Sequence, residues 1–366
     1  MKKRMLAVIC ALAIIGAGVV QAANFSSWQQ NLQITFSGYT QPETLTNFPV
    51  LIVLANGLDG GEFQYSQFAS SSGGDLRFSD STQTNELNYE IEIWNTNGNS
   101  YVWVQVPALS SNSYICAYWG NTNQTTPPAY TTNGATWSSG FATVYHMNQT
   151  SGGTVYDSTA NHNNGGFNSS GGYSWTNNGA ADGCVQFPAS GANSGITAGG
   201  SSISWSVSAW FMGLLPTSSQ RTLYLDQNGN DINIGGGSSV VECYGGYGQH
   251  VSSPNVTITP ASSSNQWQQL TAVGTGGNTL IYVNGVYGGT CATEGSGSTR
   301  SIGFDSSLWQ GGRQWATSLD EFRIESAARS ANWVWASYMT MASNSVFSSY
   351  GAAPAPALTG PVIRIK

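Results

Sequence analysis

The sequence contains few charged residues. They make up 8% of its 366 residues, against about 25% in typical soluble proteins, and Lys366 is the only lysine after residue 4. Three of the eleven basic residues and none of the eighteen acidic ones lie in residues 1–22, so the chain without that segment has a net charge of −10. This net negative charge argues against nucleic acid and anionic membrane surfaces as partners.

Long apolar runs are absent after the first twenty residues. Residues 2–4 are basic, residues 5–20 are apolar, and small residues follow at Ala22 and Ala23, which is the pattern of a secretory signal. We expect residues 1–22 to be removed and the protein to be secreted to an extracellular, cell-surface or periplasmic location. No later stretch approaches the roughly 20 apolar residues of a spanning helix, so we expect no membrane insertion.

Cysteine is also scarce, and four cysteines follow the leader: Cys116, Cys184, Cys243 and Cys291. An oxidising compartment would allow three different pairings, which the sequence alone does not rank. We choose Cys243 with Cys291 because both fall in one expected domain, on either side of a hairpin. The alternative is four small, buried thiols.

Helical periodicity is nearly absent, whereas glycine (45 residues) and aromatic residues (12%) are common. Short alternating or β-branched runs separated by Gly, Asn and Ser predict strands of β-sandwiches. These runs are residues 32–36, 48–54, 75–78, 88–94, 101–106 and 114–119, followed by 141–147, 183–187, 204–212, 221–225, 267–273, 279–283 and 320–324. Asn284-Gly285 between two runs predicts a tight hairpin, and residues 328–341 predict a short helix.

The two series of strands predict two all-β domains. Prolines and small polar residues interrupt the rhythm at residues 125–135, where we place the boundary. We expect a leader at 1–22, an N-terminal β domain at 23–125, a linker at 126–135, a second β domain at 136–350 and an Ala/Pro-rich tail at 351–366.

The usual signatures of catalytic and metal sites are missing. There is no His-x-x-x-His, no Cys-x-x-Cys and no Gly-rich loop opening a helix after a strand. His146, His162 and His250 have no nucleophile motif beside them. His146 lies on an apolar strand, so we expect it to be a core residue.

Three carboxylates on one expected strand form the main catalytic candidate. Alternation places Glu86, Glu90 and Glu92 on one face, with about 6 to 7 Å between residues i and i+2. Glycosidases place their carboxyl groups about 5 to 9.5 Å apart, so distance alone allows Glu90 and Glu92 to act as a hydrolase pair. The alternative, which we favour, is a solvated strand face with Ile91 and Ile93 turned inward.

Residues 136–350 resemble a laminin-G-like module of the concanavalin A-like lectin/glucanase superfamily. The resemblance rests on "VYHMNQTSGGTVYDSTANHNNGG" (144–166), "SWSVSAWF" (204–211), "NQWQQLTAVGTGGNTLIYVNGVYGG" (265–289) and "SLDEFRIESAARS" (318–330). It implies a concanavalin A-like jelly-roll sandwich in the C-terminal domain. Glucanases of this superfamily carry their acidic strand inside that sandwich, whereas "EIEIW" (90–94) precedes it, so the resemblance favours a non-catalytic role.

Residues 24–125 resemble a bacterial envelope-associated domain of unknown function that often precedes such modules. The matching stretches are "NFPVLIVL" (47–54), "GGDLRFSDS" (73–81), "ELNYEIEIW" (86–94), "YVWVQVPAL" (101–109) and "YICAYWGN" (114–121). The resemblance implies a sandwich-like β domain and no known activity.

A calcium site is the metal hypothesis that the sequence supports. Residues 157–165 crowd side-chain oxygens into one loop, and calcium selects such hard ligands. The laminin-G resemblance suggests that Asp320 lies near this loop, so we predict calcium on Asp157 and Asp320. The alternative is an Asx-type turn in which Asp157 caps its own loop.

Exposed aromatic residues beside polar groups are the usual platforms for sugars. Tyr244, Tyr247, Trp309 and Trp315 fall among glycines and serines, and we predict that they form a ligand-binding rim. The sequence therefore predicts a secreted, non-catalytic protein that binds glycan or an envelope component. A structural or adhesive subunit that self-associates or binds protein is the alternative, and a glycoside hydrolase is the third reading.

Overall fold

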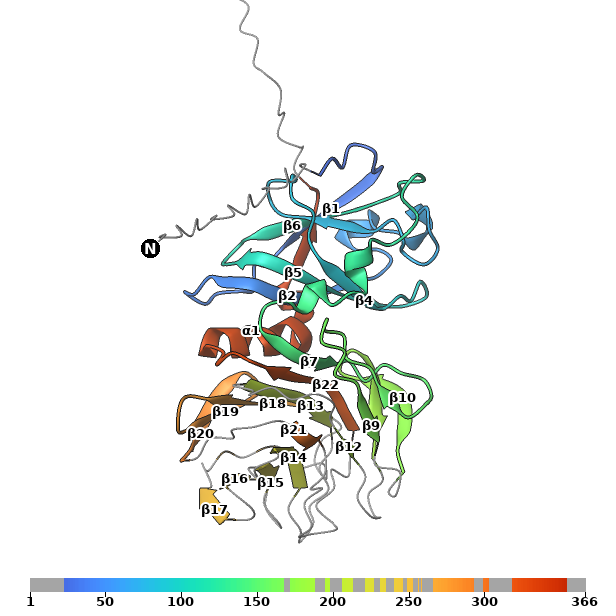
Figure 1. The fold of residues 1–366 in the computed structure, drawn as a ribbon. Helices are drawn as coiled ribbons and strands as arrows, with labels where there is room; N and C mark the ends of the chain where they lie inside the picture. The colour runs from blue at the N-terminus through green and yellow to red at the C-terminus, as the bar shows by residue number, and fades with distance from the viewer. Residues whose placement is uncertain are drawn as a thin grey trace, which may run out of the picture.

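The computed structural model describes the chain with gaps. The described residues are 23–167, 172–187, 195–197, 206–212, 221–226, 231–234, 240–245, 249–252, 256, 258, 266–292, 299–302 and 318–353. The expected leader and most of the expected tail lie outside them. Figure 1 shows an N-terminal β unit stacked on a C-terminal β unit, with helix α1 between them.

The N-terminal unit is a sandwich of two antiparallel sheets. One sheet has the order β23 (Ser349–Gly351), β1 (Gln30–Thr35), β6 (Tyr114–Trp119) and β3 (Arg77–Ser79). The other has the order β2 (Leu45–Leu54), β5 (Ser100–Leu109) and β4 (Tyr89–Ile93). Apolar side chains of both sheets, among them Ile34, Phe78, Val50 and Val104, form one buried cluster. Short 3-10 turns lie at η1 (Asp59–Gly61) and η2 (Tyr65–Gln67).

The C-terminal unit is a larger sandwich. Its first sheet has the order β10 (Ser174–Gly179), β11 (Asp182–Gln186), β22 (Ser318–Glu325), β13 (Ser206–Met212), β18 (Trp267–Gly274), β19 (Thr279–Val283) and β20 (Val286–Cys291), and β7 (Phe141–Tyr145) also pairs with β22. The second has the order β17 (Gln249–Ser252), β16 (Val241–Gly245), β15 (Asp231–Ile234), β14 (Arg221–Asp226), β21 (Thr299–Ile302), β12 (Ile196–Thr197), β9 (Gly165–Phe167) and β8 (Thr154–Val155). Phe211, Leu270 and Ile281 of the first sheet share a buried cluster with Val241 and Ile302 of the second.

The all-β fold and its two domains are as predicted. The hairpin at Asn284-Gly285 is also confirmed: the two residues have φ values of 51° and 75°, and Val283 pairs with Val286 across the turn. Both residue types tolerate this left-handed conformation, which fixes the register of β19 on β20.

The predicted disulfide is present. Cys243 on β16 is bonded to Cys291 on β20, with 6.1 Å between their Cα atoms. Because β16 and β20 belong to different sheets, the bond ties the two layers of the C-terminal sandwich together. Cys116 and Cys184 are free and buried.

The predicted helix is α1 (Ala331–Ala342), which is followed by α2 (Asn344–Phe347). Ser330 caps α1 by accepting a hydrogen bond from Trp333 N at 3.1 Å. The ring centroid of Trp333 lies 4.7 Å from that of Phe48 on β2, and Tyr338 stacks on Trp210 of β13 at 5.5 Å. The helix therefore packs against both domains.

The C-terminal segment differs from the predicted domain boundary at residue 350. Strand β23 pairs with β1, so the chain returns from the second domain to complete the N-terminal sheet. The predicted linker at 126–135 is likewise packed, as the turns η3 (Ala129–Thr131) and η4 (Ala135–Trp137). The Tyr130 ring meets Tyr89 at 5.6 Å, so this stretch belongs to the N-terminal unit.

Candidate functional site

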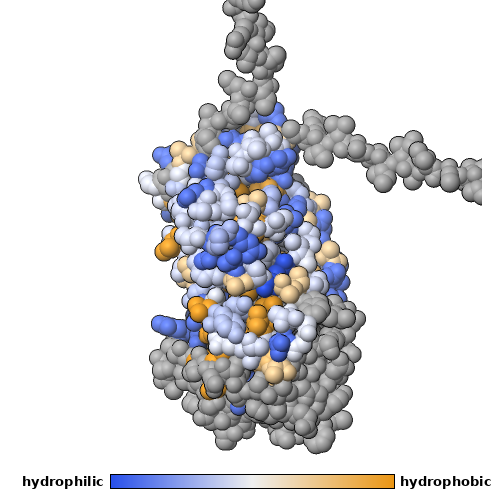
Figure 2. All heavy atoms as spheres, turned by 90° about the vertical axis from the view of Figure 1, so that its left-hand side faces the viewer, coloured by the Kyte–Doolittle hydropathy of each residue, from blue (hydrophilic) through white to orange (hydrophobic). Residues whose placement is uncertain are grey.

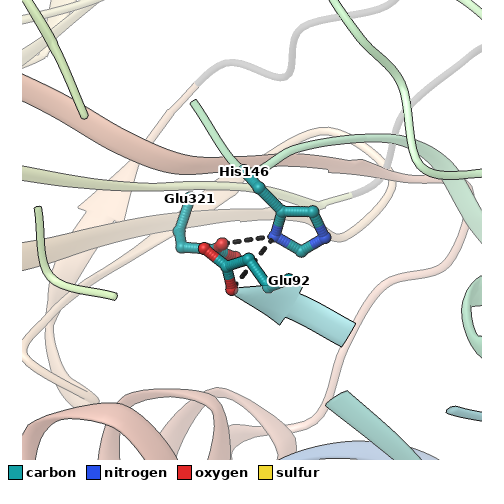
Figure 3. A group of neighbouring side chains, drawn as sticks. All are labelled: Glu92, His146 and Glu321. Atoms are coloured by element: carbon teal, nitrogen blue, oxygen red, sulfur yellow. Dashed lines mark hydrogen bonds and ion pairs between the residues drawn. The ribbon is translucent and has the colours of Figure 1, made fainter. Parts of the chain in front are cut away.

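A buried cluster of charged side chains lies where the two domains meet (Figure 3). Strand β4 of the N-terminal domain contributes Glu92, and the C-terminal domain contributes His146, just after β7, and Glu321 on β22. The Nδ1 atom of His146 lies 2.5 Å from Oε1 of Glu321 and 3.6 Å from Oε2 of Glu92. All three side chains are almost inaccessible to solvent.

A local irregularity in β22 helps to place Glu321. Its φ is 46°, and the pairing of β22 with β13 shifts register between Ser208 and Trp210. A β-bulge of this kind re-aims a side chain. Glu321 turns to His146, whereas its neighbour Asp320 accepts hydrogen bonds from Ala180 N and Ala181 N.

Arg323 supplies a fixed positive charge to the cluster. Its Nη2 atom lies 2.6 Å from Oε2 of Glu321. Its guanidinium also lies over the rings of Trp103, at 4.3 Å, and Trp137, at 4.9 Å. Cation–π contacts of this kind strengthen when they are shielded from water, as they are here.

Glu90 and Glu92 connect the same indole rings to the second domain. Trp103 Nε1 donates to Oε2 of Glu92 at 2.7 Å, and Trp137 Nε1 donates to Oε2 of Glu90 at 2.5 Å. Glu90 also accepts a hydrogen bond from Ser158 Oγ at 2.8 Å. Both carboxylates of β4 are therefore committed to contacts at the junction.

The pKa shifts assign charges to the cluster. Burial raises the pKa of Glu92 well above its usual value, and the charge of Glu321 raises it further. Burial opposes the charged form of Glu321, but His146 and Arg323 outweigh it and lower the pKa of Glu321. Burial also opposes the charged form of His146, yet the neighbouring carboxylates raise its pKa well above 6.5. The cluster therefore favours the charged forms of His146 and Glu321 and disfavours the charged form of Glu92.

The prediction of a solvated strand face is wrong for Glu92. Alternation placed Glu90 and Glu92 on one side correctly, because both lie within 3.7 Å of His146. That side is covered by the second domain, which the alternation of a single strand does not reveal. His146 is buried as predicted, with an ionic environment that its apolar neighbours in sequence did not indicate.

The trio of Glu92, His146 and Glu321 also has the donor types of a metal site. One ligand atom of each residue lies within 4.8 Å of the others, and a nitrogen with two oxygens suits transition metals better than calcium. Arg323 and the proton on His146 already supply positive charge beside Glu321.

The two residues predicted to bind calcium accept hydrogen bonds from their own surroundings. Asp157 accepts from Val144 N at 2.9 Å, Thr159 N at 3.0 Å and Asn163 N at 2.8 Å. Asp320 accepts from Ala180 N at 2.7 Å and Ala181 N at 3.1 Å. For Asp157 this is the arrangement of the Asx-type turn, the alternative to calcium. The calcium site stays a prediction.

Family models match both parts of the chain. Residues 190–334 match the concanavalin A-like lectin/glucanases superfamily, and residues 72–177 match a domain of unknown function. The chain carries a concanavalin A-like module behind a domain of unknown function. The match to the domain of unknown function runs past the predicted linker and through β7 into β10, in line with the packing of Trp137 and Phe141 on the N-terminal core.

No curated protein matches this chain. Among solved structures, domain 4 of AbnA, a GH43 extracellular arabinanase from Geobacillus stearothermophilus, is 19% identical, with a TM-score of 0.42 over 54% of this chain and 97% of that one. The binding domain of Paraclostridial Mosquitocidal Protein 1 is 15% identical, with a TM-score of 0.40 over 54% and 52%. The receptor-binding domain of botulinum neurotoxin type G is 15% identical, with a TM-score of 0.37 over 55% and 51%.

The predicted aromatic rim falls mostly outside the described part of the concanavalin A-like module. Tyr247, Trp309 and Trp315 lie beyond the described residues, as does the side chain of Tyr244. The backbone of Tyr244 lies on β16, paired with Asp231 and His250. The ligand-binding role of these four residues remains a prediction.

Proposed function

We propose that this is a secreted, non-catalytic binding protein that recognises glycan or another envelope component through its concanavalin A-like module. The family match over residues 190–334 carries the proposal. The leader-like residues 1–22 support secretion. In the described part of the chain, no helix combines the length and the apolar character needed to span a bilayer.

The junction supports the non-catalytic part of the proposal. A glycosidase acid and nucleophile must reach the scissile bond of a bound sugar. The side chain of Glu92 is fully buried and therefore not open to a sugar. Glu90 accepts hydrogen bonds from Trp137 and Ser158. The acidic strand β4 thus contributes to the packing of the two domains.

The test is a glycan and polysaccharide array probed with residues 23–366 in calcium and again in chelator. Binding to a defined glycan class supports the proposal, and its loss in chelator supports calcium at Asp157 and Asp320. Equal binding and an unchanged melting temperature in both buffers would reject the calcium site. No binding to the array in either buffer would contradict glycan recognition.

Self-association as an adhesive subunit is the second candidate, and the surface of β20 favours it. Val286 and Tyr287 are 66% and 54% exposed on the strand that ends the described first sheet. Exposed edge strands invite pairing with another chain. Elsewhere on this side, Figure 2 shows apolar residues in small, separate groups on a hydrophilic surface. A monomer by light scattering at micromolar concentration would reject this candidate.

A further inference from the structure

The N-terminal domain, which has no assigned activity, contains an open groove of about 600 Å³. It lies between the first described residues, the start of β3 and the loop that follows β6. Its walls include Phe25, Trp28, Arg77, Glu86, Asn123 and Tyr130. The volume falls within the range of about 300 to 1,000 Å³ that is common for ligand sites.

The one arginine in the groove is fully committed to the protein. Arg77 is buried, and its Nη1 atom donates to Gly74 O at 3.0 Å and Leu76 O at 2.6 Å. Its Nη2 atom donates to Thr126 O at 3.1 Å, and its Nε atom lies 3.3 Å from Glu86. An arginine held in this way offers little to a phosphate or carboxylate, so the groove does not favour an anionic ligand.

Glu86 offers acceptor capacity to a ligand. Its side chain is 33% exposed, and Oε1 takes both the Arg77 contact and a hydrogen bond from the Tyr130 hydroxyl at 2.5 Å. Within the described residues, Oε2 makes no hydrogen bond. Because Arg77 balances the charge of Glu86, the groove presents a polar acceptor with no net charge, which suits a neutral ligand that donates hydroxyl groups.

A fixed aromatic ring lies in the same groove. The indole of Trp28 is half-buried, and its Nε1 atom donates to Asp75 O at 2.9 Å. The ring of Phe25 meets the indole in an edge-to-face arrangement, with 5.5 Å between the ring centroids. The exposed residues Asn123 and Gln124, both amides, also line the groove. A rigid ring with amides and a carboxylate can contact the apolar face and the hydroxyl groups of a sugar together.

We propose that this groove is a binding site for a neutral oligosaccharide. It lies in the other domain from the concanavalin A-like module, so the proposal goes beyond the function proposed above and stands or falls separately. A proline-rich peptide is the competing occupant, because Tyr and Trp also line such grooves. Two of the residues that line the groove, Pro127 and Pro128, are already prolines of the protein itself. The acceptor groups of the groove match the hydroxyl donors of a sugar better than they match a proline-rich peptide.

The test uses residues 23–366 with short gluco-, manno-, xylo-, arabino- and chito-oligosaccharides. Calorimetry measures affinity, and hydrogen exchange locates the protected segments. We expect protection at residues 23–28 and 121–130, and an affinity at least about ten-fold lower in Glu86→Gln, equivalent to about 1.4 kcal/mol. Asn123→Ala should weaken binding without altering the melting temperature, since its side chain is exposed.

Glu62→Gln is the matched control, because Glu62 is exposed and lies outside the groove. Equal affinity of Glu86→Gln and Glu62→Gln would overturn the proposal. Protection confined to residues 190–334 would also overturn it, while leaving the function of the concanavalin A-like module intact. Binding of a proline-rich peptide in place of every sugar would assign the groove to that partner instead.

Discussion

At the residue scale, two buried glutamates that share one histidine have pKa values shifted in opposite directions. His146 and Arg323 lower the pKa of Glu321, whereas burial raises the pKa of Glu92. Oε2 of Glu92 accepts a hydrogen bond from Trp103. The side-chain oxygen of a glutamine can accept the same hydrogen bond. The same substitution should therefore have a small effect at Glu92 and a large one at Glu321.

We predict that Glu92→Gln changes the free energy of unfolding at pH 7 by less than about 1 kcal/mol. Glu321→Gln should lower it by about 3 to 5 kcal/mol, because it leaves Arg323 and His146 buried without their anion. Urea denaturation of both variants at one pH makes the comparison. Equal losses in the two variants would show that Glu92 is also charged.

The sequence predicted part of this chemistry. Alternation along residues 86–94 indicated that Glu90 and Glu92 share a face, and both contact His146. The burial of that face depends on β22, more than 220 residues later. Strand periodicity carries no information on such distant neighbours.

At the element scale, the C-terminal segment protects an exposed edge. Strand β2 has a single hydrogen-bonded neighbour among the described strands, β5. Leu51 N of β2 donates to Thr340 Oγ1 at 2.9 Å, and Asn344 Nδ2 donates to Leu51 O at 2.7 Å. Side chains of α1 and α2 thus replace a missing strand, which is one way of protecting a sheet edge.

Thr340→Val should destabilise the protein by about 1 to 3 kcal/mol, since it leaves the buried Leu51 amide without an acceptor. Thr340→Ser retains the hydroxyl and is the matched control, with a smaller loss expected. Chemical denaturation compares the two variants. A serine variant as unstable as the valine variant would show that the methyl group, and not the hydrogen bond, matters at this position.

The disulfide between β16 and β20 should stabilise the C-terminal sandwich by closing a long loop. Its cysteines are 48 residues apart, for which loop entropy gives about 4 kcal/mol. Reductant should therefore lower the stability of the native protein and leave a Cys243→Ser, Cys291→Ser double variant unchanged. An equal effect of reductant on both proteins would contradict a stabilising role.

Local signals predicted the elements themselves better than their partners. The Asn284-Gly285 turn fixed one hairpin, and Ser330 marks the start of α1 as an N-cap. Nothing in residues 331–351 indicates that they pack on the first domain. Their apolar side chains could pack against either sandwich, so only the assembled fold shows which one they contact.

At the scale of the whole molecule, the charged cluster and α1 make the two domains one unit. The contact is ionic and fully enclosed, so its strength should depend on protonation. The pKa of His146 is raised above 6.5 and that of Glu92 above 4.5. A group whose pKa rises on folding stabilises the folded state below its unfolded pKa and loses that contribution as pH rises through the folded value.

We therefore predict that stability declines as pH rises above about 4.5, where the unfolded chain loses the Glu92 proton, and more steeply above about 6.5, where it also loses the His146 proton. The slope approaches about 1.4 kcal/mol per pH unit for each proton lost. Glu321, whose pKa is lowered, should add a separate loss as pH falls below about 4.5. Urea denaturation across this range measures both slopes. His146→Gln should flatten the alkaline decline, and an unchanged slope would place the titration elsewhere.

We propose that the acidic strand holds the domains together and that the concanavalin A-like module binds without cleaving. The most direct measurement follows binding and reducing-end release together, on each polysaccharide that residues 23–366 retain. We expect saturable binding with no release above the buffer control, in the native protein and in Glu90→Gln alike. Release by the native protein that disappears in Glu90→Gln or Glu92→Gln would contradict it and establish a hydrolase.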